Sequence, residues 1–220
     1  MIMKKYITKS IIKWLVVALV AGFIFFWLIA ENWKEPVTIE KPVIYLYPQV
    51  ETQVNVKLDY DGELTCTYPL YKEDTGWLVT ARPDGTLTGT DGQEYNYLYW
   101  EGEIDTEYDF SKGFCIAGKD TAVFLEDVLA ELGLNRREAN EFIIYWLPQM
   151  EQNEYNIIAF QHEAYTEGAE LLIDPAPDTL IRVFMAWKPS DKLIEIVPQQ
   201  LENPERVGFT VIEWGGSQVK

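Results

Sequence analysis

The chain has 220 residues, of which 48% are hydrophobic, and its 35 acidic and 18 basic side chains give a net charge of −17. All 35 acidic residues follow residue 30, whereas four of the lysines precede residue 14, so residues 31 to 220 carry 14 basic residues and a net charge of −21. This balance excludes nucleic acid and anionic lipid as partners of that part, because both are held mainly by Lys and Arg. A cation, a basic protein or a cell-wall component is favoured instead.

The first predicted element is a transmembrane helix over residues 11 to 30. Residues 14 to 30 read WLVVALVAGFIFFWLIA and contain no charge. At about 1.5 Å per residue, the whole element is long enough to cross a hydrocarbon core of roughly 30 Å. Trp14 and Trp27 lie near its two ends, where indole rings favour the membrane interface. The sequence therefore predicts a single-pass anchor in the plasma membrane.

Charge predicts the orientation of this anchor. Four lysines precede it, whereas only Lys34 follows it closely, which indicates a cytoplasmic N-terminus over residues 1 to 10. The alternative is a cleaved signal peptide, but Leu28 stands where a small residue is expected before a cleavage site. Both interpretations place residues 31 to 220 on the extracytoplasmic side of the membrane.

The predicted extracytoplasmic part begins with a linker over residues 31 to 40 (ENWKEPVTIE), and residues 41 to 220 are long enough for one domain. Strand-like runs separated by turns predict a β-rich lobe over about 41 to 118, either a meander or a small sandwich. A helical hairpin follows over about 120 to 148, and a second set of strands over about 155 to 215. The expected class is α+β with a largely antiparallel sheet.

The helical hairpin has recognisable ends. Asp120 is expected to cap the first helix, and Gly133 is expected to end it. Asn135 and Glu138 have the spacing of a capping box at the start of the second helix. Pro148 is expected to end that helix, because a proline has no N–H to donate.

Several stretches of the domain resemble an uncharacterised family of secreted or membrane-anchored bacterial proteins that open with the motif KPVIYLYP, here residues 41 to 48. The other matching stretches are GWLVTARPDG, EYNYLYWEG, FIIYWLPQM, LIRVFMAWKP and VIEWGG. The resemblance covers almost the whole exported part and implies one intact extracytoplasmic domain. It implies no reaction, ligand or catalytic residue.

The most unusual pattern in the sequence is a row of carboxylates at two-residue spacing in WEGEIDTEYDF. Its members are Glu101, Glu103, Asp105, Glu107 and Asp109. If the run is extended, all five side chains point to the same face. One interpretation is a solvent-facing edge strand protected by charge. The other is a row of oxygen ligands for Ca²⁺, or a docking strip for a basic partner.

Three further residues invite a structural interpretation. Arg182 stands inside the apolar run LIRVFMAW, where a buried guanidinium needs a carboxylate or a ligand, and a structural ion pair is the expected solution. Cys66 and Cys115 are available for a disulfide in an exported protein. The alternative is that each cysteine is simply a small buried residue.

Catalytic motifs are missing from the sequence. The chain has one histidine, His162, with no Gly-x-Ser-x-Gly elbow and no zinc-ligand spacing, which disfavours nucleophilic and zinc hydrolysis. We therefore expect an exported domain that binds a ligand or partner and is not an enzyme. Two alternatives are a glycan hydrolase that uses a carboxylate pair and a calcium-stabilised structural module. For the hydrolase, tryptophans could provide sugar-stacking surfaces, and the candidates are Trp77, Trp100, Trp146, Trp187 and Trp214.

Overall fold

The computed structural model describes residues 36 to 202 and 204 to 219. The predicted cytoplasmic segment 1 to 10 and the predicted span 11 to 30 lie outside the described residues. Within the described ranges, no helix has both the length and the apolar character needed to cross a membrane.

Two β-sheets form the framework of the domain. The larger sheet has seven strands, in the order β3 (Gly62–Tyr68), β7 (Leu98–Ile104), β1 (Val37–Tyr47), β12 (Thr210–Gln218), β11 (Thr179–Ser190), β9 (Tyr155–Gln161) and β8 (Phe114–Ala117). The smaller sheet has five strands, in the order β10 (Ala169–Asp174), β2 (Thr52–Tyr60), β4 (Trp77–Ala81), β5 (Leu87–Gly89) and β6 (Glu94–Tyr95). All described pairs of neighbouring strands are antiparallel except β11 and β12.

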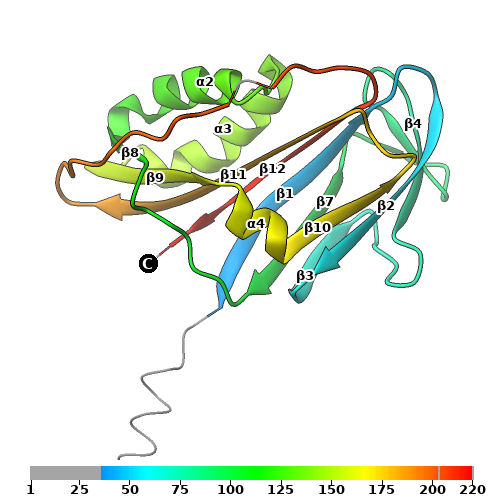
Figure 1. Ribbon diagram of the computed structural model, residues 1–220, viewed down its shortest axis with the longest axis horizontal. Helices are drawn as coiled ribbons and strands as arrows, with labels where there is room; N and C mark the ends of the chain where they lie inside the picture. Colours follow the sequence, from blue (N-terminus) through cyan, green and yellow to red (C-terminus); the bar gives the residue numbers. More distant parts are fainter. Residues whose placement is uncertain (1–35, 203, 220) are drawn as a thin grey trace, which may run out of the picture. The chain divides into compact units, whose positions relative to one another are not determined.

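The helices and the smaller sheet cover opposite faces of the larger sheet (Figure 1). Helices α2 (Thr121–Glu131) and α3 (Arg136–Met150) pack against one face, after a short 3₁₀ turn, η1 (Gly118–Asp120). Strands of the smaller sheet pack against the other face, together with the short helix α4 (Glu163–Gly168). The domain therefore has three layers and two hydrophobic cores.

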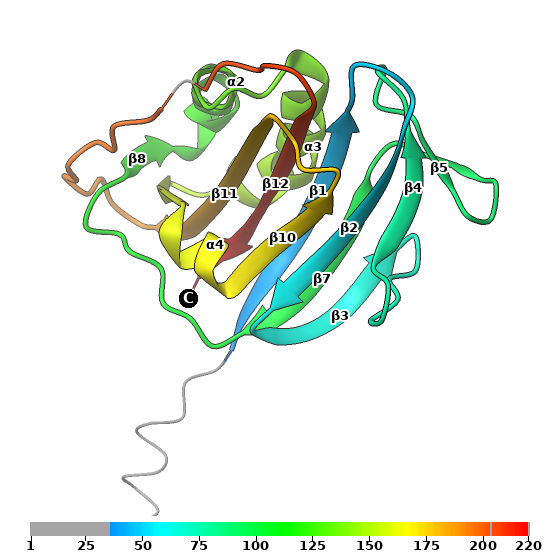
Figure 2. The ribbon, with the colours of Figure 1, turned by 45° about the vertical axis from the view of Figure 1, so that its right-hand side comes forward.

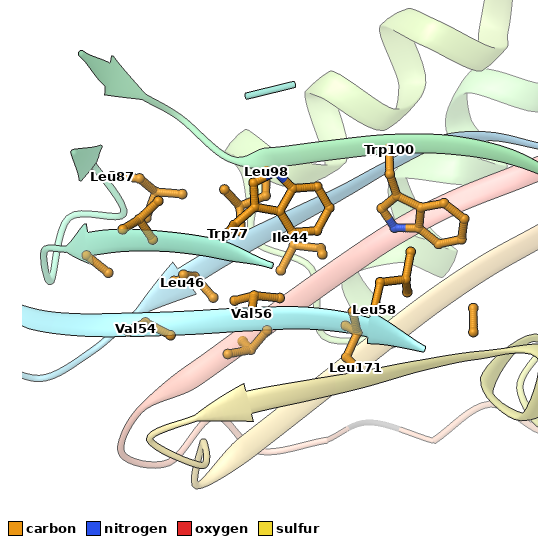
Figure 3. Close-up of a cluster of buried hydrophobic side chains, with 14 of the residues drawn as sticks. Ile44, Leu46, Val54, Val56, Leu58, Trp77, Leu87, Leu98, Trp100 and Leu171 are labelled. Atoms are coloured by element: carbon orange, nitrogen blue, oxygen red, sulfur yellow. The ribbon is translucent and has the colours of Figure 1, made fainter. Parts of the chain in front are cut away.

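Strand β1 contributes to both cores because successive side chains of a strand point to opposite faces. Ile44 and Leu46 pack between the two sheets, and Figure 3 shows Ile44 near Leu98 and Leu46 near Val54 of the smaller sheet. Val43 and Tyr45 point to the helical face instead. An apolar run without polar alternation, such as VIYLY, is typical of a strand that is covered on both faces.

The α+β class and the predominance of antiparallel strands are confirmed. The predicted order of strands, helical hairpin and further strands is present along the chain. The first set of strands does not form a lobe of its own, because strands from both sets pair within the same sheets. In the larger sheet, β1 pairs with β12, and in the smaller sheet, β2 pairs with β10 (Figure 2). Neither half could bury its apolar faces without the other.

The predicted linker also ends earlier than expected. Strand β1 already begins at Val37, inside the range 31 to 40, and Ile39 is buried in the core between the sheets. Backbone pairing of residues 37 to 39 with β7 gives this segment the strand structure that its composition did not indicate.

Some of the predicted helix caps and ends are present in the structure, and others are not. The capping box of Asn135 and Glu138 is present, and Gly133 adopts a φ of 88° after α2. Asp120 occupies the N-cap position of α2, but its side chain makes no capping hydrogen bond. The expected end at Pro148 is wrong, since α3 continues to Met150, which is buried in the helical core. A proline in the last turn removes a single helical hydrogen bond, which the end of a helix tolerates.

Candidate functional site

The candidate site is built around a β-bulge in strand β1. Between Glu40 and Val43 the register of β1 slips against both of its neighbours, β12 and β7, so β1 carries one extra residue there. Such a bulge bends the strand and redirects a side chain, and bulges are frequent next to functional sites. Lys41 and Pro42 occupy this bulge.

Lys41 has a strained backbone. Its φ of 60° is the one positive φ of a non-glycine residue among the described residues. This conformation is unfavourable for a residue with a Cβ and is more so before a proline, which disfavours helical conformations at the preceding position. Strain of this kind costs on the order of 1 to 3 kcal/mol and is concentrated at functional sites.

The sequence around the bulge satisfies its backbone groups. Pro42 has no N–H, and the N–H of Lys41 donates to Oε1 of Glu101 at 3.3 Å. On the neighbouring strand, a Cβ at Gly215 would lie only 3.0 Å from Cγ of Pro42. A glycine at this position therefore allows Pro42 to approach β12 closely.

The side chain of Lys41 lies over two tyrosine rings, one of Tyr99 in β7 and one of Tyr97 just before this strand. Its Nζ atom is 5.2 Å from the ring centroid of Tyr97 and 5.1 Å from that of Tyr99. Both distances are within the roughly 6 Å range of a cation–π interaction. Tyr99 and Glu101 share one face of β7, because residues at two-residue spacing point the same way, and Tyr97 directly precedes the strand.

Carboxylates accept hydrogen bonds from two tyrosine hydroxyls of this site, those of Tyr99 and Tyr145. Burial first, and the neighbouring Glu101 second, raise the pKa of Tyr99. The hydroxyl of Tyr145 on α3 donates to Oε2 of Glu40 at 3.0 Å, and burial together with Glu40 raises the pKa of Tyr145. Each of these tyrosines therefore remains a neutral hydrogen-bond donor at physiological pH.

We call this group the Lys41 patch, and it consists of Glu40, Lys41, Tyr97, Tyr99, Glu101 and Tyr145. All six side chains are half-buried. At its rim, the hydroxyl of the buried Tyr45 donates to Oε2 of Glu141 at 3.0 Å, and the ring of Tyr45 packs edge-on against that of Tyr97. Nε of Arg137 lies 3.9 Å from Oε1 of Glu141. The patch and its rim thus combine strands β1 and β7 with helix α3.

The predicted row of carboxylates does not form one continuous strip. Glu101 and Glu103 lie in β7, whereas the strand ends at Ile104 and the other three carboxylates follow in an irregular segment. Asp109 accepts hydrogen bonds from the backbone N–H and the hydroxyl of Ser111 at 2.7 and 2.8 Å. Only Glu101 takes part in the Lys41 patch.

Calcium coordination by that row has no geometric support. Among the residues that the structure describes, no group of three or more His, Cys, Asp or Glu side chains is arranged to hold a metal ion. Ca²⁺ takes six to eight oxygen ligands, which a chain of exposed and separated carboxylates does not provide.

The proposed disulfide is contradicted by the fold. Both cysteines are free, with Cys66 exposed on β3 and Cys115 half-buried on β8. These strands form opposite edges of the seven-stranded sheet, about 29 Å apart at roughly 4.8 Å per strand. A disulfide needs its Cα atoms within about 7 Å.

Arg182 makes a buried ion pair between the two sheets. Its Nε atom lies 2.5 Å from Oε2 of Glu213, and the side chains are 5% and 0% exposed. Trp100 donates from Nε1 to the other carboxylate oxygen at 3.0 Å, and the guanidinium stacks on the ring of Tyr165 at 4.6 Å. Burial is the largest influence and by itself would lower the pKa of Arg182, but Glu213 and Tyr165 together outweigh it and raise the pKa of the guanidinium.

A separate hollow of about 430 Å³ is lined by the end of β9 and the first half of β11. Arg182, His162 and Gln199 are among its lining residues. The charge of Arg182 is already neutralised by Glu213, and the side chain of Gln199 bonds to the backbone of Phe160. Two of its polar side chains are therefore already bonded within the domain, although Nη2 of Arg182 has no hydrogen-bond partner among the described residues.

The tryptophans proposed as sugar-stacking surfaces are core residues. Trp77 is 2% exposed and the other four are fully buried. The residues that the sequence interpretation missed are those of the Lys41 patch, apart from Glu101. Two features could have indicated it: a Lys-Pro pair directly before the buried run VIYLY, and the spacing of Tyr97, Tyr99 and Glu101.

Comparison with known proteins adds little to this geometry. No protein-family model matches the chain, and no solved structure is significantly similar to it. The chain is similar to an uncharacterised protein in the bglA 3′ region of Butyrivibrio fibrisolvens, with 52% identity over 64 residues. The match covers 29% of this chain and 66% of that protein, which is just less than two thirds of its length.

The buried ion pair generates a prediction about stability. Replacing Glu213→Gln leaves the Arg182 cation buried without a counter-charge, and should lower the free energy of unfolding by about 3 to 5 kcal/mol in urea denaturation. The double variant R182M/E213Q should recover part of this loss. The exposed pair Arg136 and Glu126 is the control, because E126Q should change stability by less than about 1 kcal/mol. Equal effects of E213Q and E126Q would contradict the prediction.

Proposed function

We propose that this chain is a single-pass plasma-membrane protein whose extracytoplasmic domain binds a ligand or partner at the Lys41 patch. The apolar stretch 11 to 30 and the lysines before it support the anchor and its orientation. The acidic composition of the remaining chain supports an exported domain that works without nucleic acid or anionic lipid.

The observation that carries the proposal is the strained bulge beneath a half-buried group of tyrosines and glutamates. A lysine needed only for packing would have no reason to occupy a left-handed conformation before a proline. The bulge instead brings Lys41 over two rings and places Glu101 beneath its backbone N–H. Four of the stretches that carry the family resemblance supply residues of the patch or the glycines beside it.

Binding is favoured over glycan hydrolysis for two reasons. The tryptophans that would stack on sugars are in the core. Glu40 and Glu101, the carboxylates of the patch, contact a tyrosine hydroxyl and a backbone N–H, respectively, within the folded domain. These contacts give both carboxylates a structural role, and their remaining lone-pair sites can accept hydrogen bonds from a ligand.

Cys66 provides a test of the proposed location, since it is exposed and free. A membrane-impermeant maleimide added to intact cells should label Cys66 in the full-length chain, and C66S should lose this labelling. In a C66S/C115S background, a cysteine introduced as K5C in the predicted cytoplasmic segment should react only after the membrane is permeabilised. Labelling of K5C in intact cells, with no labelling of Cys66, would contradict the proposed orientation.

A ligand panel tests the binding function. Full-length protein in detergent should show a raised melting temperature with at least one of four probes: calcium chloride, a chitooligosaccharide, a lysine-rich peptide and a glutamate-rich peptide. The variant Y97L/Y99L should lose this shift because it removes the polar ring surfaces of the patch. Y155L is the matched control, since Tyr155 lies half-buried on β9, four strands away from β7 in the larger sheet.

The control measurement is near-ultraviolet circular dichroism, which must show that Y97L/Y99L is folded. A shift that survives in folded Y97L/Y99L would contradict binding at the patch. Release of reducing sugar from the chitooligosaccharide, abolished by E101Q, would replace the binding proposal with the hydrolase alternative.

A further inference from the structure

We infer that the Lys41 patch recognises the cationic side chains of a basic polypeptide, and that Lys41 occupies this cation site in the free domain. The inference rests on the proposed binding function and names the chemistry of its ligand. It is drawn from the position of the Lys41 ammonium group, which lies about equally far from the centroids of Tyr97 and Tyr99.

The two rings form a surface suited to a cation. The face of an aromatic ring is electron-rich and attracts an ammonium or guanidinium group within roughly 6 Å of its centroid. Pairs and cages of such rings are a recurrent way to bind organic cations. In this domain, the rings of Tyr97 and Tyr99 already hold an ammonium group that belongs to the same chain.

Carboxylates next to these rings add hydrogen-bond acceptors. Glu40 and Glu141 each accept one tyrosine hydroxyl, and Glu101 accepts the N–H of Lys41. A carboxylate has about four lone-pair sites, so each can accept further N–H donors from a ligand. Lysine has three donors and arginine has five, and charge-assisted bonds to carboxylates are stronger than neutral ones.

The arrangement fits a polypeptide with several cations better than a single small amine. Glu40 on β1, Glu101 on β7 and Glu141 on α3 lie on three different elements. The patch and its rim contain these three carboxylates but only two cations, Lys41 and Arg137. The region therefore keeps a net negative charge. The net charge of −21 beyond residue 30 would attract a basic partner from a distance and repel an acidic one.

Lys41 can leave the rings without unfolding the strand. Its ammonium group is carried on a flexible four-carbon stem, while the bulge itself is fixed by Pro42, Gly215 and Glu101. A cation from the partner would therefore take the place of Lys41, and the Lys41 side chain would move into solvent. This exchange predicts that Lys41 competes with the partner and weakens its binding.

The test uses a fluorescent lysine-rich peptide and full-length protein in detergent, with binding measured by anisotropy. The same peptide with acetylated lysines is the charge control. Lys41→Gly removes the competing ammonium and suits the positive φ, so it should tighten binding about 3- to 10-fold, in proportion to one cation–π contact. Lys192→Gly removes the same charge from an exposed loop residue outside the patch and should leave affinity within about 2-fold.

Two further variants locate the contact. E101Q should weaken binding about 10-fold, because it removes a charge but keeps an acceptor for the Lys41 N–H. E170Q, which changes an exposed carboxylate on β10 of the other sheet, should have little effect. Equal losses in E101Q and E170Q would show that only the overall acidity attracts the peptide, and would overturn the inference.

The affinity of K41G for the lysine-rich peptide is a second test of the inference. Unchanged or weaker binding of the lysine-rich peptide to K41G would overturn the inference, as would equal binding of the acetylated peptide. If the chitooligosaccharide binds through Tyr97 and Tyr99 but the lysine-rich peptide does not, the inference fails while the proposed binding function stands. If no probe binds at the patch, both fail.

Discussion

The fold depends on how strand β1 packs in the middle of the domain. It pairs with β7 on one side and β12 on the other, and its two faces supply residues to both hydrophobic cores. The bulge at Lys41 and Pro42 is inserted into this strand, where a slip in register affects both neighbours at once. Gly215 of β12 allows Pro42 to approach closely, so the strain at Lys41 is held by the most extensively paired part of the sheet.

The patch follows from this constraint. Without the extra residue, the chain at Lys41 would remain in the regular ladder and its N–H would bond to a neighbouring strand. With it, the N–H turns to Glu101, and the side chain reaches the rings of Tyr97 and Tyr99. Helix α3 completes the group, because Tyr145 donates to Glu40 from the helical layer. The binding site proposed here would need little ordering when a partner arrives, because it lies on a paired framework.

Local chemistry explains which features the sequence could reveal. The capping box of Asn135 and Glu138 involves residues three positions apart, and it is present as expected. Arg182 required a counter-charge, and the structure provides Glu213, but its identity depends on the parallel register of β11 and β12. Such a register joins segments that are distant in the chain and leaves no local pattern.

The same limit explains the errors. The two-residue spacing of the five carboxylates predicts one extended strand, whereas β7 ends at Ile104 and the following chain leaves the sheet. The cysteines were compatible with a disulfide until the strand order placed them at opposite edges. The patch itself unites residues near positions 40, 100 and 145, and periodicity within any one of these segments does not predict their meeting.

The position and exchange of the Lys41 ammonium group can be measured directly by nuclear magnetic resonance of full-length protein with ¹³C-methylated lysines, a modification that keeps the charge. The Lys41 methyl resonance, assigned by its loss in K41G, should be shifted upfield by the two tyrosine rings. A saturating lysine-rich peptide should return it to the position of solvent-exposed lysines. Lys188 is the internal control, because its Nζ atom lies 4.5 Å from the ring centroid of Phe110. Its methyl resonance should keep its own ring-current shift throughout the titration. A Lys41 resonance that is unshifted in the free protein, or still shifted at saturation, would contradict this account.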